Sequence, residues 1–234
     1  MRTDSRTLRW LGYALTGLLA VGVLIHAWYA AHILWWRYNP VGETSFMSYR
    51  MDELRAKNPK AVLKYQWVPY ERVSSNLKRA MIAAEDSKFV EHEGFDWDGI
   101  QKAIEKNEKR GRIVAGGSTI TQQLAKNLFL TPARSWFRKA QETAITLMLE
   151  LMLPKRRILE IYLNVIELGS GVFGAEAASR HYFGTPAVAL SPEQGARLAA
   201  MAPNPRYYER NGSAPGFNRK IGIILARMPL AELP

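Results

Sequence analysis

The stretch "AAEDSKFVEHEG", residues 83–94, places a charged side chain where the surrounding pattern calls for an apolar one. Leu77, Met81, Glu85 and Phe89 recur every four residues, so they lie on one stripe of a helix. Leu77, Met81 and Phe89 are apolar, as a core-facing stripe requires. The pattern therefore predicts a packed helix that carries a carboxylate on its apolar stripe.

Two interpretations of Glu85 stay open from this stretch alone. The glutamate is either a salt-bridged core residue or a carboxylate whose surroundings are set for proton transfer. In the second case, loss of hydration raises the pKa of the carboxyl toward the range useful to a base at neutral pH. Asp86 and His92 are further site candidates, and they suit helix-end caps equally well.

Composition indicates a folded protein and narrows its chemistry. The chain has 234 residues, of which 47% are hydrophobic and 23% charged, typical of one or two folded domains. It has no cysteine, which excludes a disulfide framework, zinc–thiolate sites and thiol catalysis. The net charge of +11 favours nucleic acid, an anionic lipid surface or a phosphorylated substrate as partner. A generally basic, solvated surface is the alternative.

The N-terminal segment 10–36 contains no Asp, Glu, Lys or Arg. As a helix it is long enough to cross a hydrocarbon layer of about 30 Å. Trp10 at one end and Trp35 at the other suit the two membrane interfaces. A signal peptide is the rival interpretation, but the apolar run is too long and no small-residue cleavage site follows it. We expect an uncleaved transmembrane helix.

The charges beside this segment predict its orientation. Arg2, Arg6 and Arg9 precede it, whereas only Arg37 follows closely. By the positive-inside rule, residues 1–9 lie in the cytoplasm and the rest of the chain lies outside. An exported domain meets little nucleic acid, so nucleic acid is not an expected partner.

The exported region is predicted to be mostly α-helical. We expect a juxtamembrane connection at 37–60, one domain at 61–225 and a C-terminal tail at 226–234. The residues at 61–70 suit a short strand, and 105–117 suit a mobile connection. Ser75, Ser118 and Ser135 are the expected N-caps of three helices. Further helices are expected at 155–168, 174–183 and 191–202.

A second motif, "GGSTITQQLAKN" at 116–127, combines two glycines with a helix start. The backbone N–H groups and dipole of such a start favour an anion. Gln122, Gln123 and Lys126 share one face of the helix at spacings of three and four. This face suits a phosphate or sugar site, although an exposed polar face with ordinary capping has the same pattern.

Two further motifs supply charges. In "RKAQE" at 138–142, Arg138 precedes Glu142 by four residues. This order stabilises a helix less than the reverse order, so helix stability explains the pair poorly. A plain surface ion pair is the alternative. In "KRRILEIYLN" at 155–164, the candidates are Lys155, Glu160 and Asn164.

Two carboxylates with several cations favour one kind of chemistry over another. A glycosidase must protonate an alkoxide leaving group, so it needs a neutral acid beside its second carboxylate. A diphosphate leaving group is already stable as an anion and needs cations instead. One carboxylate then suffices as the base, and the sequence suits this second chemistry better.

These motifs resemble, in order, those of the monofunctional biosynthetic peptidoglycan transglycosylases of glycosyltransferase family 51, which polymerise lipid II. A fifth motif, "APNPRYY" at 202–208, matches less strictly because Arg206 stands where a smaller residue is frequent. The resemblance covers roughly residues 60 to 210, and the chain length suggests the monofunctional type. It implies a mainly α fold: a lysozyme-like helical head and a smaller membrane-facing jaw lobe, preceded by the transmembrane helix.

The resemblance also implies residue roles. Glu85 would be the general base of an inverting transfer that forms β-1,4-linked glycan and releases undecaprenyl diphosphate. Glu142 would orient cations, or a divalent ion such as Mg or Mn, near the phosphates. The implied substrate-binding and diphosphate-binding residues are Ser118, Thr119, Gln122, Gln123, Lys126, Arg134, Arg138 and Lys139.

The implied setting is the bacterial inner membrane, with the catalytic domain in the periplasm. The expected partners are lipid II, the growing lipid-linked strand, membrane lipids, and other cell wall synthases or divisome proteins. The nearest rival is a lysozyme-like lytic enzyme. A membrane-anchored scaffold of the cell wall without activity is a rival of another class.

Overall fold

The computed structural model describes residues 5–112, 116–133, 135–212 and 214–234. The chain forms two compact units, Met1–Asn39 and Pro40–Pro234. The predicted connection at 37–60 and the predicted tail therefore fall mostly or wholly within the second unit.

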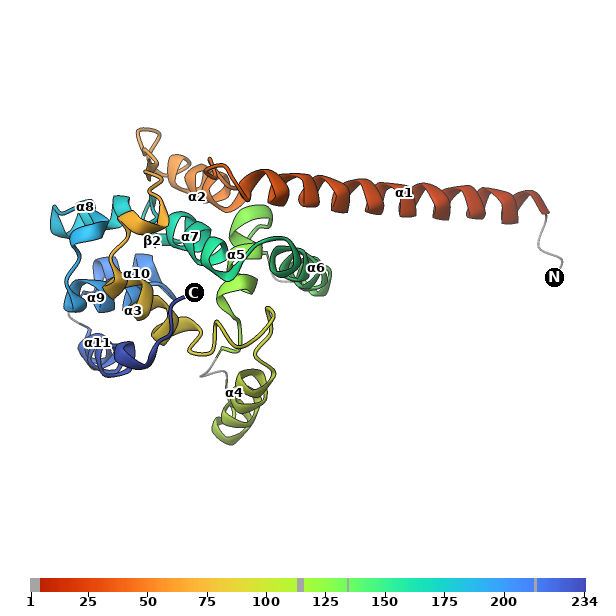
Figure 1. Ribbon diagram of the computed structural model, residues 1–234. Coiled ribbons are helices and arrows are strands. Elements are labelled where there is room, and N and C mark those ends of the chain that lie inside the picture. The colour runs from red at the N-terminus through yellow and green to blue at the C-terminus, as the bar shows by residue number, and fades with distance from the viewer. Residues whose placement is uncertain (1–4, 113–115, 134, 213) are drawn as a thin grey trace. The chain divides into compact units, whose positions relative to one another are not determined.

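The first unit is a single long helix, α1 (Ser5–Trp36), drawn in red in Figure 1. Its segment Arg9–Trp36 spans 28 residues with a mean hydropathy of 1.7. A helix of this length and composition can cross a membrane. The structure therefore confirms a helix compatible with the predicted single-pass anchor.

The second unit is mainly helical, as predicted. Its α-helices are α2 (Ser45–Arg55), α3 (Ser75–Glu85), α4 (Trp97–Arg110), α5 (Ile120–Phe129), α6 (Trp136–Met152), α7 (Lys155–Val165), α8 (Ala175–Phe183), α9 (Pro192–Met201), α10 (Pro205–Arg210) and α11 (Pro215–Arg227). Short 3₁₀ turns lie at Tyr70–Arg72, Ala187–Ala189 and Met228–Leu230.

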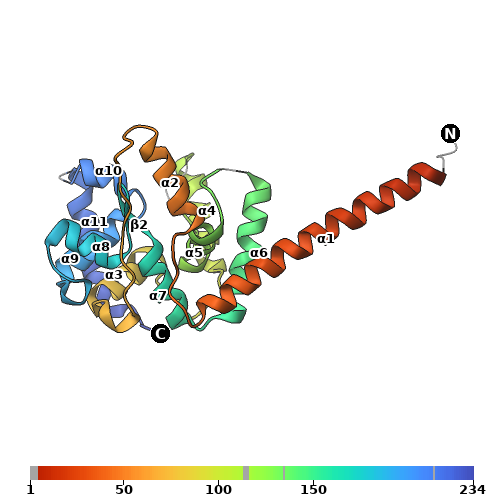
Figure 2. The same cartoon turned by 90° about the horizontal axis from the view of Figure 1, so that it is seen from above.

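Two groups of helices build the core, as Figures 1 and 2 show. Helix α3 packs against α9 and α11, whereas α5 packs against α2, α6 and α7. Leu77 and Met81 of α3 are fully buried, as the apolar stripe predicts, but α3 ends at Glu85, so the buried Phe89 lies beyond the helix and not on its stripe. Gly195 of α9 permits a close approach, because a Cβ there would lie 3.0 Å from the backbone of α3 at Leu77. The core thus fixes the end of α3.

A small sheet braces the segment before α3. Its strands are β1 (Lys64–Tyr65), β2 (Glu167–Gly169) and β3 (Val172–Phe173), in the order β1-β3-β2. Strand β1 pairs parallel to β3, and β2 pairs antiparallel to it. Gly174, with φ of 81°, follows β3, and a Cβ there would lie 2.2 Å from the Asn164 carbonyl oxygen. Only glycine fits this turn.

The structure corrects two predicted caps by one residue. Ser74, not Ser75, caps α3, and its hydroxyl accepts from the backbone N–H of Asn76. Thr119, not Ser118, caps α5. Adjacent hydroxyl residues have the same capping chemistry, so tertiary contacts decide which one takes the position. Ser135 caps α6 as predicted.

Several elements escaped prediction. Helix α4 continues through Arg110, so 105–110 are helical, not a mobile connection; residues 113–115 lie outside the described residues. Helices α2 and α11 were not predicted, because polar residues interrupt the apolar pattern of α2, and proline and glycine weaken that of α11. Helix α11 runs past residue 225, and Met228 and Ala231 beyond it are buried. The structure thus shows no separate tail at 226.

Candidate active site

Glu85 is the last residue of α3, where the helix emerges from the core. Its side chain is half-buried, and the Nε2 of Gln123 donates to its Oε2 at 2.8 Å. The hydroxyl of fully buried Tyr162 donates to the Oε1 of Gln123 at 3.1 Å. This second bond fixes the orientation of the amide, so its N–H group faces the carboxylate. The Glu85 carboxylate is held by a partly buried chain of hydrogen bonds.

Burial raises the pKa of Glu85 above its ordinary value. The Gln123 hydrogen bond and the positive charges of Lys220 and Lys126 act in the opposite direction but do not cancel the effect. Lys220 lies on α11, and its ammonium donates to the carbonyl oxygen of Ala200 at 3.1 Å. Sequence reasoning missed Lys220, because no local pattern links a residue near the C-terminus to Glu85.

Asp86 and His92 connect the first two motifs. The buried Asp86 carboxylate accepts from the backbone N–H of Ile120 at 3.0 Å and pairs with the His92 Nε2 at 2.8 Å. The backbone N–H of Gly94 donates to the His92 Nδ1 at 3.2 Å. The Nδ1 is thus an acceptor and the Nε2 carries the hydrogen. The two side chains hold the end of α3 against the start of α5.

The start of α5 is fixed by a capping box. The Thr119 hydroxyl accepts from the Gln122 backbone N–H, and the Gln122 side chain accepts from the Thr119 backbone N–H. The Thr119 hydroxyl also donates to the Gly94 carbonyl oxygen at 2.7 Å. Both side chains are buried, so their observed contacts are structural. Ser118, by contrast, is exposed.

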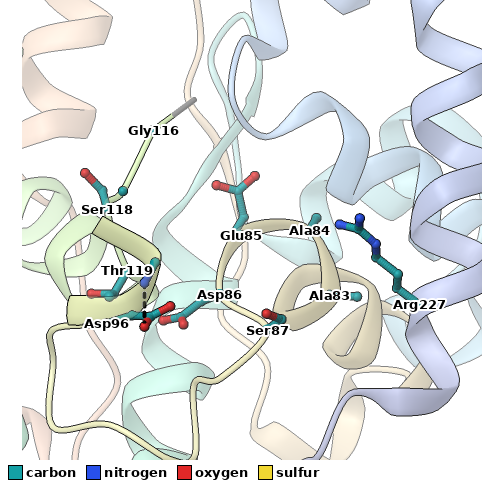
Figure 3. A pocket seen from close by; sticks show the side chains of 12 residues that line it. Ala83, Ala84, Glu85, Asp86, Ser87, Asp96, Gly116, Ser118, Thr119 and Arg227 are labelled. Carbon is teal, nitrogen blue, oxygen red and sulfur yellow. Dashed lines mark hydrogen bonds between the residues drawn. The ribbon is translucent and has the colours of Figure 1, made fainter. Parts of the chain in front are cut away.

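A cleft of about 250 Å³ brings six of the predicted site residues together. It is lined by Glu85, Ser118, Gln122, Gln123, Lys126, Glu142, Ala202 and Pro203. A second hollow of about 170 Å³ adjoins it on the other side of Glu85. Figure 3 shows Ser118 and Arg227 on opposite sides of the Glu85 carboxylate in this hollow. Glu85 is thus accessible from two depressions that meet at its side chain.

A cation cluster surrounds Glu142, which lines the cleft. The buried Glu142 carboxylate accepts from the Arg138 Nη1 at 2.6 Å and pairs with the Lys139 ammonium. The Arg138 Nε is buried and has no hydrogen-bond partner among the described residues. Burial lowers the pKa of the nearby Lys126, although the charge of Glu142 opposes this. Arg134, predicted to belong here, lies outside the described residues.

The donor set at Glu142 does not fit a resident divalent ion. Both of its oxygens already accept from cations. In the described part of the chain, no group of three or more His, Asp or Glu side chains is placed to hold a metal. A divalent ion that arrives with a diphosphate substrate stays a prediction.

The fourth motif has structural contacts. Lys155 pairs with Glu150 at 2.8 Å, and Glu160 accepts from the Tyr70 backbone N–H at 3.1 Å. The fully buried Asn164 donates to the carbonyl oxygen of Val68 and accepts from its N–H, both at 2.9 Å. Lys155, Glu160 and Asn164 are not among the residues that line the cleft.

Comparisons with known proteins show relatives over nearly the whole chain. A family model described as transglycosylase matches residues 52–229. The chain is 64% identical to the biosynthetic peptidoglycan transglycosylase of Dechloromonas aromatica, covering 97% of this chain and 98% of the relative. It is 58% identical to the protein of the same name from Azoarcus sp., covering 97% of each chain. The corresponding Chromobacterium violaceum protein is 58% identical, covering 94% of this chain and 96% of the relative.

Proposed function

Because the chain belongs to the family of peptidoglycan transglycosylases, glycosyltransferases of cell wall synthesis, we propose that it polymerises lipid II into β-1,4-linked glycan and releases undecaprenyl diphosphate. One observation carries the proposal. A single cleft joins a carboxylate of raised pKa, Glu85, to Lys126 and to the Glu142 carboxylate that holds Arg138 and Lys139.

In this reaction Glu85 is the general base. It takes the proton from the 4-hydroxyl of the acceptor's N-acetylglucosamine, and that oxygen attacks the anomeric carbon of the donor's N-acetylmuramic acid. Attack from the face opposite the leaving group converts the α-linked donor into a β-1,4 bond. The Gln123 hydrogen bond to the Glu85 Oε2 supports this role, because it holds the carboxylate in place and leaves the other oxygen to meet the hydroxyl.

The cations stabilise the departing diphosphate. Lys126 borders the cleft, and Arg138 retains a buried N–H that a phosphate oxygen would satisfy. Glu142 fixes the directions of Arg138 and Lys139 by its two ion pairs. Arg134 belongs to the same proposal on sequence grounds alone. Since the leaving group departs as a stable anion, no carboxylic acid has to protonate it.

The other predicted donor-site residues divide into two kinds. The exposed Ser118 hydroxyl borders the cleft, which supports a direct contact with the sugar. Thr119 and Gln122 act by building the start of α5, although Gln122 also reaches the cleft. Divalent ions act with the substrate's phosphates and not through a protein site.

The proposed setting is the bacterial inner membrane, with the N-terminus in the cytoplasm and the catalytic unit in the periplasm. A polyprenyl substrate stays in the bilayer, so an anchored enzyme meets it at high effective concentration. Apolar side chains exposed on α4 and α6, including Trp97, Trp136 and Phe137, support a membrane-facing lobe. Other cell wall synthases and divisome proteins are the proposed protein partners.

The test is a polymerisation assay with the detergent-purified full chain. Labelled lipid II is supplied to the wild type, to Glu85→Gln and to Glu91→Gln, and the products are resolved on a gel. Glu91 is an exposed carboxylate of the same motif and serves as the matched control. We expect long, lysozyme-sensitive strands from the wild type and the control, and none from Glu85→Gln.

Two results would contradict the proposal. Full polymerisation by folded Glu85→Gln would remove Glu85 as the base. Release of soluble fragments from preformed glycan, without polymer from lipid II, would favour the lytic alternative.

A further inference from the structure

Four charged side chains from three separate elements form a closed ring, here called the charge ring: Arg50, Glu53, Glu167 and Arg206. Arg50 donates to Glu53 at 2.8 Å and to Glu167 at 3.1 Å. Arg206 donates to Glu53 at 3.1 Å and approaches Glu167 at 3.7 Å. Each charge therefore meets two of opposite sign, and the ring joins α2, β2 and α10.

The charge ring is partly shielded from water, unlike an ordinary surface ion pair. The Glu167 side chain is 7% exposed and that of Arg50 is 17% exposed. Burial raises the pKa of Glu167, against the lowering effect of the two arginines. Such a group is stable as a carboxylate only while its cations stay in place. The ring thus links α2 to α10, although the Glu167 Oε1 on the Arg206 side has no hydrogen-bond partner among the described residues.

On the α2 side, the ring leads to the cation of the cleft. The Arg50 guanidinium lies over the buried ring of Phe46, 4.9 Å from its centroid. The Lys126 ammonium lies 5.8 Å from the centroid of the same ring. Helix α2 also packs against α5, which carries Lys126. Any shift of α2 therefore moves the surface against which Lys126 rests.

On the α10 side, the ring leads to the wall of the cleft. Arg206 is the second residue of α10, and the preceding loop contributes Ala202 and Pro203 to the lining. The fifth sequence motif, whose role the sequence left open, thus connects the cleft wall to α2.

We propose that Arg206 and Glu167 are positioning residues: through the charge ring they set α2, and with it Phe46, against Lys126, so that Lys126 meets the leaving group at the right distance. The inference rests on the proposed function for the identity of that group. Arg206 and Glu167 touch no substrate and act through Lys126 and the cleft wall.

The experiment measures geometry and activity separately in the detergent-solubilised full chain. Lysine side chains are labelled with ¹³C by reductive methylation and observed by NMR. The methyl signal of Lys126 is assigned by its loss in Lys126→Arg. The ring current of Phe46 shifts this signal, and Phe46→Leu gives the unshifted position. The test variants are Arg206→Leu and Arg206→Lys. Arg210→Leu is the control, because within the described part of the chain its side chain bonds to the carbonyl oxygen of Arg206 in the same helix and takes no part in the charge ring.

We expect Arg206→Leu to lose the Phe46-dependent shift while Arg210→Leu keeps it. Arg206→Leu should also raise KM for lipid II about tenfold with a smaller change in kcat, because Lys126 holds the diphosphate before and during the reaction. Arg206→Lys should restore part of both effects, since it keeps the charge but not the two-sided geometry.

The outcomes separate the ring from the proposed reaction. An unchanged Lys126 signal in folded Arg206→Leu would overturn the inference, as would a lost shift with unchanged KM. If the wild type makes no polymer but Arg206→Leu still loses the shift, the link between the charge ring and Lys126 holds and the proposed function is contradicted.

Discussion

At the scale of single residues, the Glu85 carboxylate occupies a position that the fold would fill more favourably with an apolar group. Its helix neighbours Leu77 and Met81 are fully buried, and burial raises the pKa of the carboxyl. A leucine would bury the same surface without losing hydration of a charge. The proposed base is therefore a carboxylate with reduced hydration that lowers the stability of the fold, and this cost can be measured.

Glu85→Gln should stabilise the protein at neutral pH. The pKa of Glu85 in the folded state lies above the ordinary 4.5. Between these two values the folded state therefore keeps a proton on Glu85 that the unfolded state has released. Stability therefore falls as pH rises from about 4.5 through the folded pKa and stays lower above it. Glutamine removes this fall. Denaturant unfolding at a series of pH values checks the sign, and a variant less stable than wild type at neutral pH would contradict it.

The reaction rate should follow a bell-shaped dependence on pH. Its acid limb lies above the ordinary pKa of glutamate, because Glu85 must be ionised to act as base and its pKa is raised. Its alkaline limb lies below the ordinary pKa of lysine, since burial lowers the pKa of Lys126. Profiles of kcat/KM check both limbs. Lys126→Arg should move the alkaline limb to higher pH, because arginine stays charged.

At the scale of elements, the start of α5 joins the first two motifs into one site. Asp86 bonds the backbone of Ile120, and Thr119 bonds that of Gly94. These contacts hold Glu85 and Gln123 at hydrogen-bond distance, although 38 residues separate them. The geometry of the proposed site thus depends on a helix start, and not only on the side chains that line the cleft.

Thr119→Ala should destabilise the fold by about 1 to 3 kcal/mol, the sum of a lost N-cap and a buried hydrogen bond. Ser118→Ala is the matched control for stability, because the neighbouring hydroxyl is exposed and is not the cap. It should stay within about 0.5 kcal/mol of wild type. Equilibrium unfolding measures the loss of stability in both variants. Equal losses would contradict the assignment of the cap to Thr119 alone.

At the scale of the whole molecule, a hydrophobic helix and a basic folded unit share one chain. The segment Arg9–Trp36 can span a bilayer, and the net charge of +11 suits anionic lipids and diphosphates. Their combination supports an enzyme that works beside a membrane on a lipid-linked anion.

The absence of native cysteine allows a direct test of orientation. Asn58→Cys, at an exposed position, should react in intact spheroplasts with a maleimide that cannot cross the membrane. Ser5→Cys should react only after lysis, since the arginines near the N-terminus favour the cytoplasmic side. Labelling of Ser5→Cys in intact cells would reverse the proposed topology.

The sequence by itself determined the local features of this protein. The uncharged run at 10–36, the apolar stripe of α3 and the glycine–hydroxyl start of α5 each follow from short-range periodicity or composition. They predicted a helix able to span a membrane, the mainly α fold, and Glu85, Gln122, Gln123 and Lys126 as candidates that line the cleft, because each property depends on neighbours within a few positions.

Only the tertiary structure decided how distant residues divide their roles. It assigned Asn164 and Glu160 to bracing the segment before α3, placed Lys220 near Glu85, and closed the charge ring around Arg206. It also chose Thr119 over Ser118 as the cap. These assignments depend on burial and on contacts between segments far apart in the chain, which no local pattern of residue types encodes.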